Sequence, residues 1–194
     1  RGQTIELEVP FLQAHLRRNL LPAAAAAQAV GVIPEGRVTL ELTAGRGQHV
    51  VLPGGVTLID GCYNANPMSM RAALEDLADT VARAPGARSV AVLGDMRELG
   101  PGGRDYHREL GEHVARAGVE LLVTVGSLAT AIAEPFGGEL HSVADAAAAA
   151  EIVPGLLRPS DVVLVKGSLA VGLELVCRAI GARAAVANGA GASA

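Results

Sequence analysis

The chain has 194 residues, which is enough for one well-packed domain and part of a second. Half of the residues are hydrophobic but only 2% are aromatic, so alanine, valine and leucine must build the core. The net charge of −4 argues against a surface that binds nucleic acid by neutralising phosphates. The two cysteines, Cys62 and Cys177, are far apart and match no spacing typical of a metal or redox motif. We therefore expect a reduced, cytoplasmic protein without a metal site.

The sequence shows no feature of a membrane or secreted protein. No apolar run is long enough to cross a membrane, so we expect no membrane insertion. The first residues, Arg1-Gly2-Gln3, contain neither a methionine nor a signal-peptide pattern. We expect the chain to be a piece of a longer protein.

The first predicted elements are a strand and a helix. Residues 4–9 alternate polar and apolar side chains, as a half-exposed strand does. Residues 11–30 have a helical pattern, which Pro22 should kink or interrupt. His15 and Asn19 lie one helical turn apart on the same face. That pair suits a ligand contact, but it equally suits a solvated helix entrance.

The next segment leads to a predicted domain boundary. We expect a short helix over residues 34–42 and a glycine-rich break at residues 45–47. Residues 48–52 and 56–62 are typical of two strands joined by a Pro-Gly-Gly hairpin turn. We place the boundary at residues 52–55, because the elements before it do not close a sheet by themselves.

From residue 67 onward the sequence alternates helices with apolar strands. The expected helices cover residues 67–84, 104–117, 128–133 and 144–157, with a last one ending near residue 180; the expected strands cover residues 89–93, 121–125, 139–143 and 161–165. This alternation indicates an α/β fold, a Rossmann-like, mainly parallel sheet with helices on both faces. We expect the Ala- and Gly-rich residues 184–194 to form a disordered tail.

Polar side chains follow three of the predicted strands. One cluster spans residues 60–66, another pairs Asp95 with Glu98, and a third pairs Lys166 with Ser168. Each cluster alone is explained by ordinary turn and capping hydrogen bonds. In a parallel sheet, however, these loops converge on one edge, where ligands bind. Together they favour a site for a phosphorylated or zwitterionic ligand.

Several familiar site motifs are missing from the sequence. It contains neither a phosphate loop of the Gly-x-x-x-x-Gly-Lys-Ser/Thr type nor a Gly-x-Gly-x-x-Gly dinucleotide motif. None of the five histidines pairs with cysteine at a zinc-like spacing. His107 and His113 are nearly opposite in phase on one predicted helix, so we predict that both are surface residues. Arg46, between two glycines, is a candidate for a phosphate or ribose contact, although it also fits a solvated turn.

Four motifs resemble the Mur ligase family. They are Tyr-Asn-Ala-Asn-Pro at residues 63–67, Val-Leu-Gly-Asp-Met-Arg-Glu-Leu-Gly at residues 92–100, His107 with Glu109 and Gly111, and Val-Leu-Val-Lys-Gly-Ser at residues 163–168. Their order and spacing fit the family, and the resemblance covers residues 15–180.

The resemblance implies an ATP-dependent ligase of peptidoglycan precursor synthesis. It would activate the carboxylate of UDP-N-acetylmuramoyl-tripeptide as an acyl phosphate, which the amine of D-alanyl-D-alanine then attacks. Residues 1–53 would be the end of the family's central ATPase domain, and residues 54–183 its C-terminal domain. The phosphate loop, the magnesium ligands and the modified lysine would lie upstream of Arg1. Phosphoryl transfer needs those groups, so we expect the isolated chain to be inactive. We also expect the protein to be monomeric.

The resemblance also implies roles for individual residues. The residues that it places at ATP are His15, Asn19, Arg46, Asp60, Tyr63, Asn64 and Asn66. The residues that it places at the substrate are Asp95, Lys166 and Ser168. No residue of this chain is expected to be catalytic or to bind a metal ion.

Three positions depart from the family pattern. Gly61 stands where a second acidic residue holds the nucleotide ribose, Leu16 replaces an asparagine after His15, and Leu169 replaces a common arginine. Glycine has no side chain to form the ribose hydrogen bond, a loss worth ~1–3 kcal/mol of ATP binding unless Asp60 replaces it.

Other functions remain open at this stage. The nearest is another amide ligase of the Mur or folylpolyglutamate type. A phospho-receiver signalling domain has similar strand ends, but it needs two adjacent acids where this chain has Asp60-Gly61. A stand-alone binding module with the same fold is the third alternative.

Overall fold

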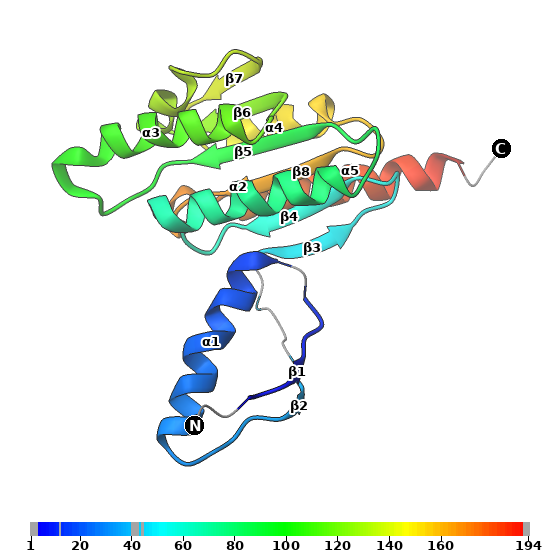
Figure 1. Cartoon of the computed structure of the whole chain (residues 1–194). Helices are drawn as coiled ribbons and strands as arrows, with labels where there is room; N and C mark the ends of the chain where they lie inside the picture. Colours follow the sequence, from blue (N-terminus) through cyan, green and yellow to red (C-terminus); the bar gives the residue numbers. More distant parts are fainter. Residues whose placement is uncertain (1–3, 12, 40–42, 44, 192–194) are drawn as a thin grey trace. The chain divides into compact units, whose positions relative to one another are not determined.

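The structure is a computed structural model that describes residues 4–11, 13–39, 43 and 45–191. It divides into two compact units, Arg1–Leu42 and Thr43–Ala194, each of which is described by itself. Figure 1 shows the elements of both units in the order of the chain. Among the described residues, no helix combines the length and the apolar composition that a membrane span requires.

The first unit contains one long helix and one short strand pair. Helix α1 spans Ala14–Ala29, and Pro22 is accommodated inside it. Strand β1 (Leu7–Glu8) pairs in parallel with β2 (Gly36–Arg37). The alternating pattern of residues 4–9 therefore yields a shorter strand than expected.

The expected helix over residues 34–42 is wrong where the structure describes this segment. Residues 34–39 hold no helix, and residues 40–42 lie outside the described residues. Gly36 adopts a φ of 80°, which an α-helix does not allow, and the amide of Val38 donates to the carbonyl of Glu8 at 2.9 Å. Pairing with β1 thus replaces the helical hydrogen bonds.

The second unit is built on one six-stranded sheet. Its spatial order is β3-β4-β8-β5-β6-β7, in which β3 is antiparallel to β4 and all other pairs are parallel. The strands are β3 (Gln48–Val51), β4 (Thr57–Gly61), β5 (Ser89–Gly94), β6 (Leu121–Val125), β7 (Glu139–Val143) and β8 (Val162–Lys166). The mainly parallel sheet predicted from the sequence is confirmed.

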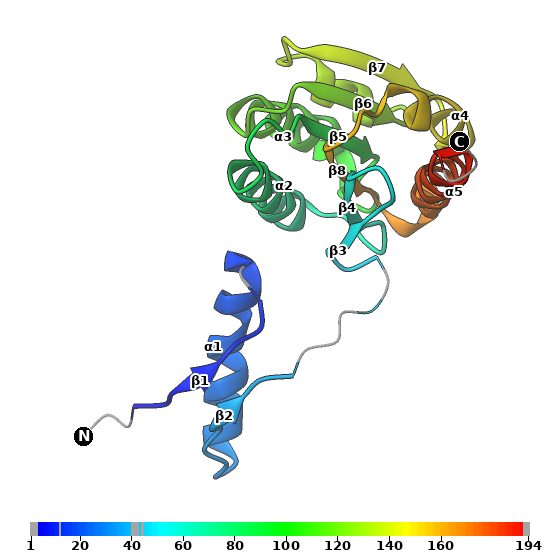
Figure 2. The ribbon, with the colours of Figure 1, turned by 90° about the vertical axis from the view of Figure 1, so that its right-hand side faces the viewer.

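Helices cover both faces of this sheet, as expected for an α/β fold. Figure 2 shows α2 and α3 on one side and α4 and α5 on the other. The α-helices are α2 (Pro67–Ala82), α3 (Gly103–Arg116), α4 (Ala146–Leu156) and α5 (Glu174–Gly191), and the 3-10 helices are η1 (Gly100–Gly102), η2 (Ala129–Ala133) and η3 (Leu169–Val171).

Alternate residues of each central strand pack into the two core layers. Val90 and Val92 of β5 belong to the layer under α4 and α5, whereas Ala91 and Leu93 belong to the layer under α2 and α3. The core is therefore made of small and medium-sized aliphatic side chains, as the scarcity of aromatic residues requires.

A buried ion pair fixes the amino ends of β5 and β8. Arg88 donates from Nη2 and Nε to the two carboxylate oxygens of Asp161, at 2.8 and 3.2 Å, and also to the carbonyl of Leu156 at 2.7 Å. The hydrogen bond to Asp161 raises the pKa of Arg88. A bidentate, nearly buried pair of this kind locks the relative register of two loops.

Two boundaries differ from the sequence-based expectation. The two units divide between Leu42 and Thr43, and β3 is hydrogen-bonded to β4 in the second unit, so the hairpin at residues 52–55 lies inside that unit. At the other end, α5 continues to Gly191, whereas we expected a disordered tail from residue 184. Alanine is the strongest helix former and no proline interrupts this stretch, so the helix continues.

Candidate functional site

The three polar clusters predicted from the sequence meet at one edge of the sheet. Strands β4, β8 and β5 are neighbours and run in parallel, so their carboxyl ends lie side by side. The loops that follow them are joined by hydrogen bonds between residues distant in the chain. This edge is therefore a built polar centre rather than three separate turns.

Lys166 links the end of β8 to the loop after β4. Its ammonium donates to the carbonyl of Asn64 at 2.7 Å and more weakly to that of Gly61 at 3.4 Å. Only 7% of the residue is exposed, and burial lowers its pKa to about 8. Lys166 therefore holds the loop in place through an ammonium whose two hydrogen bonds do not fully offset the cost of its burial.

The absence of a side chain at Gly61 leaves room for Lys166. A Cβ atom at this position would lie 3.3 Å from both Cγ and Cδ of Lys166. The two residues are paired in the β4–β8 register and share the face covered by α2. Position 61, where the resemblance leads us to expect a second carboxylate, is thus directly beside the side chain that carries the ammonium.

Asp95 and Ser168 hold the loops after β5, β6 and β8 together. The buried carboxylate of Asp95 accepts from the amide of Ala129 at 2.8 Å, and its backbone carbonyl accepts from the amide of Ser168 at 3.1 Å. The hydroxyl of Ser168 accepts from the amide of Arg97 at 2.9 Å. A Cβ at Gly126 would come within 2.5 Å of the Asp95 carboxylate, so this approach requires glycine.

His107 is buried, and the prediction that it is a surface residue is wrong. Its Nε2 accepts from the amide of Met96 at 2.8 Å, so Nδ1 carries the proton and donates to the carbonyl of Gly103 at 2.6 Å. The imidazole therefore supports the loop that carries Asp95. Its helical phase gave no sign of this role, because the partner amide belongs to a different loop. His113 is half-buried.

The loop at residues 62–66 ends in a helix cap. The side-chain oxygen of Asn66 accepts from the amide of Ser69 at 2.8 Å, and Ser69 Oγ accepts from the amide of Asn66 at 3.1 Å, which completes a capping box at the start of α2. The side-chain oxygen of Asn64 accepts from the amide of Ala65 at 2.8 Å. Each amide oxygen thus accepts a local hydrogen bond, which fixes the orientation of both side chains.

Arg46 and Tyr63 form a second polar feature of this loop. The guanidinium carbon of Arg46 lies 4.0 Å from the centre of the Tyr63 ring, a cation–π contact. The amide of Tyr63 donates to the carbonyl of Gly45 at 3.1 Å, where a Cβ would come within 2.9 Å of that amide. Tyr63 is 46% exposed, so the pair presents an aromatic ring and a cation at the surface.

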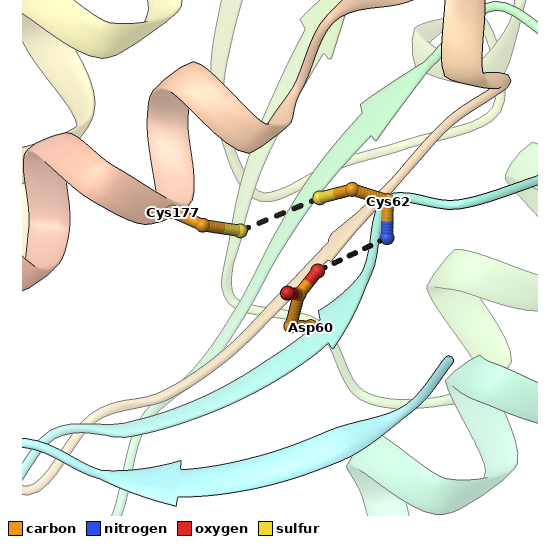
Figure 3. A group of neighbouring side chains, drawn as sticks. All are labelled: Asp60, Cys62 and Cys177. Atoms are coloured by element: carbon orange, nitrogen blue, oxygen red, sulfur yellow. Dashed lines mark hydrogen bonds between the residues drawn. The ribbon is translucent and has the colours of Figure 1, made fainter. Parts of the chain in front are cut away.

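The structure also brings together two residues that the sequence analysis had set apart. Cys62 follows β4 and Cys177 lies in α5, yet their sulfur atoms are 3.3 Å apart (Figure 3). Asp60 accepts from the amide of Cys62 at 3.1 Å. The hydrogen bond with Cys177 and burial raise the pKa of the Cys62 thiol well above its usual range. Spacing in the sequence gave no signal for this contact.

Two predicted site residues belong to the first unit. His15 and Asn19 lie in α1, and Asn19 is exposed. Because the two units are described separately, their role at ATP stays a prediction.

Comparison with known proteins agrees with this geometry. The family description "Mur ligase, glutamate ligase domain" matches residues 45–169. The UDP-N-acetylmuramoyl-tripeptide–D-alanyl-D-alanine ligase of Mycobacterium tuberculosis is 40% identical over 193 residues, which cover 86% of this chain and 38% of that protein. The Escherichia coli ligase of the same name is 34% identical over 183 residues, covering 91% and 39%.

Solved structures show the same similarity. A crystal structure of MurF from Acinetobacter baumannii aligns with a TM-score of 0.77 and 29% identity over 90% of this chain and 39% of that chain. MurF from Thermotoga maritima in complex with ADP shares the fold, with a TM-score of 0.74 and 24% identity over 93% of this chain and 40% of that chain. The chain thus spans about two fifths of the length of the relatives it matches. With the family description matching well over half of its residues, the chain belongs to the Mur ligase family.

Proposed function

We propose that this chain is part of an ATP-dependent, amide-forming ligase that adds D-alanyl-D-alanine to UDP-N-acetylmuramoyl-tripeptide in peptidoglycan precursor synthesis. The observation that carries the proposal is the 34–40% identity to relatives of that name over most of the chain. The polar edge formed by three neighbouring parallel strands supports it, because ligands of open α/β sheets bind at such edges. The proposed compartment is the cytoplasm, and the proposed state is a monomer.

The proposed ATP-facing part is the loop that follows β4. The exposed ring of Tyr63 offers a stacking surface, and the guanidinium of Arg46 suits a phosphate or ribose hydroxyl. The residues assigned to ATP are His15, Asn19, Arg46, Asp60, Tyr63, Asn64 and Asn66. When bound, ATP supplies the phosphoryl group that activates the substrate carboxylate. The residues of this chain bind and orient it.

The proposed substrate-facing part consists of Asp95, Lys166 and Ser168. D-Alanyl-D-alanine carries one ammonium and one carboxylate, and this edge holds the buried carboxylate of Asp95 and the buried ammonium of Lys166. Lys166 also ties the ATP loop to the end of β8 through the carbonyl of Asn64. We therefore assign Lys166 a positioning role that couples the two halves of the site.

We assign no magnesium ligand and no phosphate loop to this chain. Phosphoryl transfer requires both, and the printed sequence lacks a phosphate-loop motif. In the proposal these groups belong to the part of the relatives' length that this chain does not match. We propose that the part of the chain before the division at Leu42 and Thr43 is the end of a central domain and that the part after it is the C-terminal domain, which moves the boundary earlier than the expected residues 53 and 54.

Phosphate release by the full-length enzyme tests the proposal. The assay supplies ATP, UDP-N-acetylmuramoyl-tripeptide and either D-alanyl-D-alanine or a single amino acid. We expect turnover with the dipeptide only, strong loss in Lys166→Met, and no change in Glu112→Gln, an exposed control on α3. Turnover with a single amino acid instead would identify a different amide ligase, and turnover by the 194-residue chain alone would refute the assigned division of labour.

A further inference from the structure

Two thiols and one carboxylate converge beside the ATP-facing loop. Asp60 and Cys62 come from the end of β4 and its following loop, and Cys177 comes from α5 (Figure 3). One ligand atom from each residue lies within 4.8 Å of the other two. Because side chains alternate along a strand, Asp60 and Cys62 share the face of the sheet that α5 covers. Three donors are thus presented to one point from two elements.

We propose that Asp60, Cys62 and Cys177 form a binding site for a thiophilic divalent cation of the Zn²⁺ type. Two thiolates and a carboxylate oxygen are a donor set that Zn²⁺ accepts in tetrahedral coordination, with water in the fourth position. The proposed function uses Asp60 at ATP, but it uses neither thiol and no metal ion at this place, so the inference goes beyond it.

The distances favour a bound ion over a disulfide. Two thiolates at about 2.3 Å from a tetrahedral ion lie roughly 3.7 Å apart. The sulfur atoms of Cys62 and Cys177 are 3.3 Å apart, so they must separate by only a few tenths of an ångström. A disulfide needs them at about 2.05 Å, an approach of more than an ångström. A small change of side-chain torsion therefore completes the ion site.

The surroundings can accommodate the charge of the occupied site. The ion displaces both thiol protons to solvent as two metal–sulfur bonds form. Two thiolates, one carboxylate and a divalent cation leave a single negative charge, and the Lys166 ammonium interacts electrostatically with Cys62. Cys62 is buried, whereas Asp60 and Cys177 are partly exposed, which gives the ion and its water a path from solvent.

Occupancy of the site would anchor the ATP-facing loop. Cys62 directly precedes Tyr63, and the ion would join it to α5, which closes the second unit. It would also hold the carboxylate of Asp60 on the α5 face, away from the face on which position 61 lies. The site is thus placed to set the position of the loop without taking part in the reaction.

Cobalt(II) binding to the 194-residue chain tests the proposal. The chain is reduced with a phosphine that does not bind metals, and Co²⁺ is added alone. We expect one equivalent to produce a near-ultraviolet sulfur-to-cobalt charge-transfer band and the visible bands of tetrahedral cobalt, and Zn²⁺ to displace it. Zn²⁺ should also protect both thiols from alkylation. The absence of the charge-transfer band in the reduced chain overturns the proposal.

Variants assign the ligands. Cys62→Ser and Cys177→Ser should each weaken cobalt binding by about 100-fold or more, and Asp60→Asn by about 10-fold. Glu112→Gln on α3 is the control and should bind as the parent chain does. Because Cys62 is buried, its variant is scored only if its circular dichroism is unchanged; the partly exposed Cys177 supplies the independent test. Full cobalt binding in a folded Cys177→Ser variant overturns the site.

Discussion

Replacing Lys166 with methionine tests whether its buried charge holds together the loops at the carboxyl ends of β4 and β8. The ammonium is buried, and its two hydrogen-bond acceptors are the backbone carbonyls of Asn64 and Gly61. Burial lowers its pKa from the ordinary value of 10.5 to about 8. Methionine keeps an unbranched apolar stem, in a side chain one atom shorter than that of lysine, but removes both the charge and the hydrogen bonds.

The sign and size of the effect follow from proton linkage. Between pH 8 and 10.5 the unfolded chain binds a proton at Lys166 that the folded chain has released, so the free energy of unfolding rises with pH over this range. The difference between 10.5 and about 8 corresponds to about 3 kcal/mol, at about 1.4 kcal/mol for each pKa unit. Below pH 8 the protonated lysine makes the folded chain less stable by that amount than a neutral lysine would, a net value that already contains the hydrogen bonds of the ammonium.

The assay compares urea unfolding of the parent chain and Lys166→Met from pH 7 to 10, in the presence of a chelator. The parent should gain stability relative to the variant as the pH rises, approaching about 3 kcal/mol in total. Arg108→Met, which removes an exposed cation from α3, is the matched control and should leave the slope unchanged. Lys166 is the only lysine in the chain, so NMR of a reductively methylated sample reports its titration directly. The reasoning is refuted if Lys166 titrates with a midpoint near pH 10.5 and the free energies of unfolding of the parent and the variant change equally with pH.

Substitutions at three further contacts are tested by urea unfolding or NMR. His107→Phe leaves a buried backbone N–H without an acceptor and should cost ~1–3 kcal/mol, with part recovered in His107→Gln; an unchanged midpoint would contradict the assigned tautomer. Arg88→Met leaves the buried carboxylate of Asp161 without its cation and should lower the free energy of unfolding by about 3–5 kcal/mol. The loss should be smaller in the double variant that also carries Asp161→Asn. Equal losses in the single and the double variant would contradict a paired charge. Gly61→Asp places a carboxylate beside the lysine, whose NMR midpoint should rise from about 8; no rise would show that the new side chain points elsewhere.

The alternating part of the fold could be predicted because its signals are local. Strands β6 and β7 were predicted at their observed bounds, residues 121–125 and 139–143, since each is a short run bounded by turn residues. The expected helix is wrong over residues 34–39 because the pairing partner of β2 lies far earlier in the sequence, at Leu7–Glu8. The end of α5 was misread because alanine and glycine together suit a tail as well as a helix.

For the site, too, local features could be predicted from the sequence, whereas contacts between distant residues could not. That Asp95, Lys166 and Ser168 share one edge followed from the strand alternation alone, because parallel strands end together. The burial of His107 and the contact between Cys62 and Cys177 did not follow. Each depends on which loop or helix packs against the residue. That neighbour is set by the spatial order of the strands in the sheet, which differs from their order in the chain.

Gly61 links these observations. From the sequence we expect a lost ribose contact at Gly61 unless Asp60 replaces it. In the structure, Asp60 lies on the α5 face and position 61 on the α2 face, beside the stem of Lys166. A carboxylate at position 61 would therefore be a partner for the ammonium before it is a partner for a ribose. With glycine there, two backbone carbonyls must hold the ammonium, and one of them, Asn64, belongs to the ATP-facing loop. The shorter of the two hydrogen bonds, 2.7 Å to the carbonyl of Asn64, therefore ties the end of β8 to the loop that follows β4.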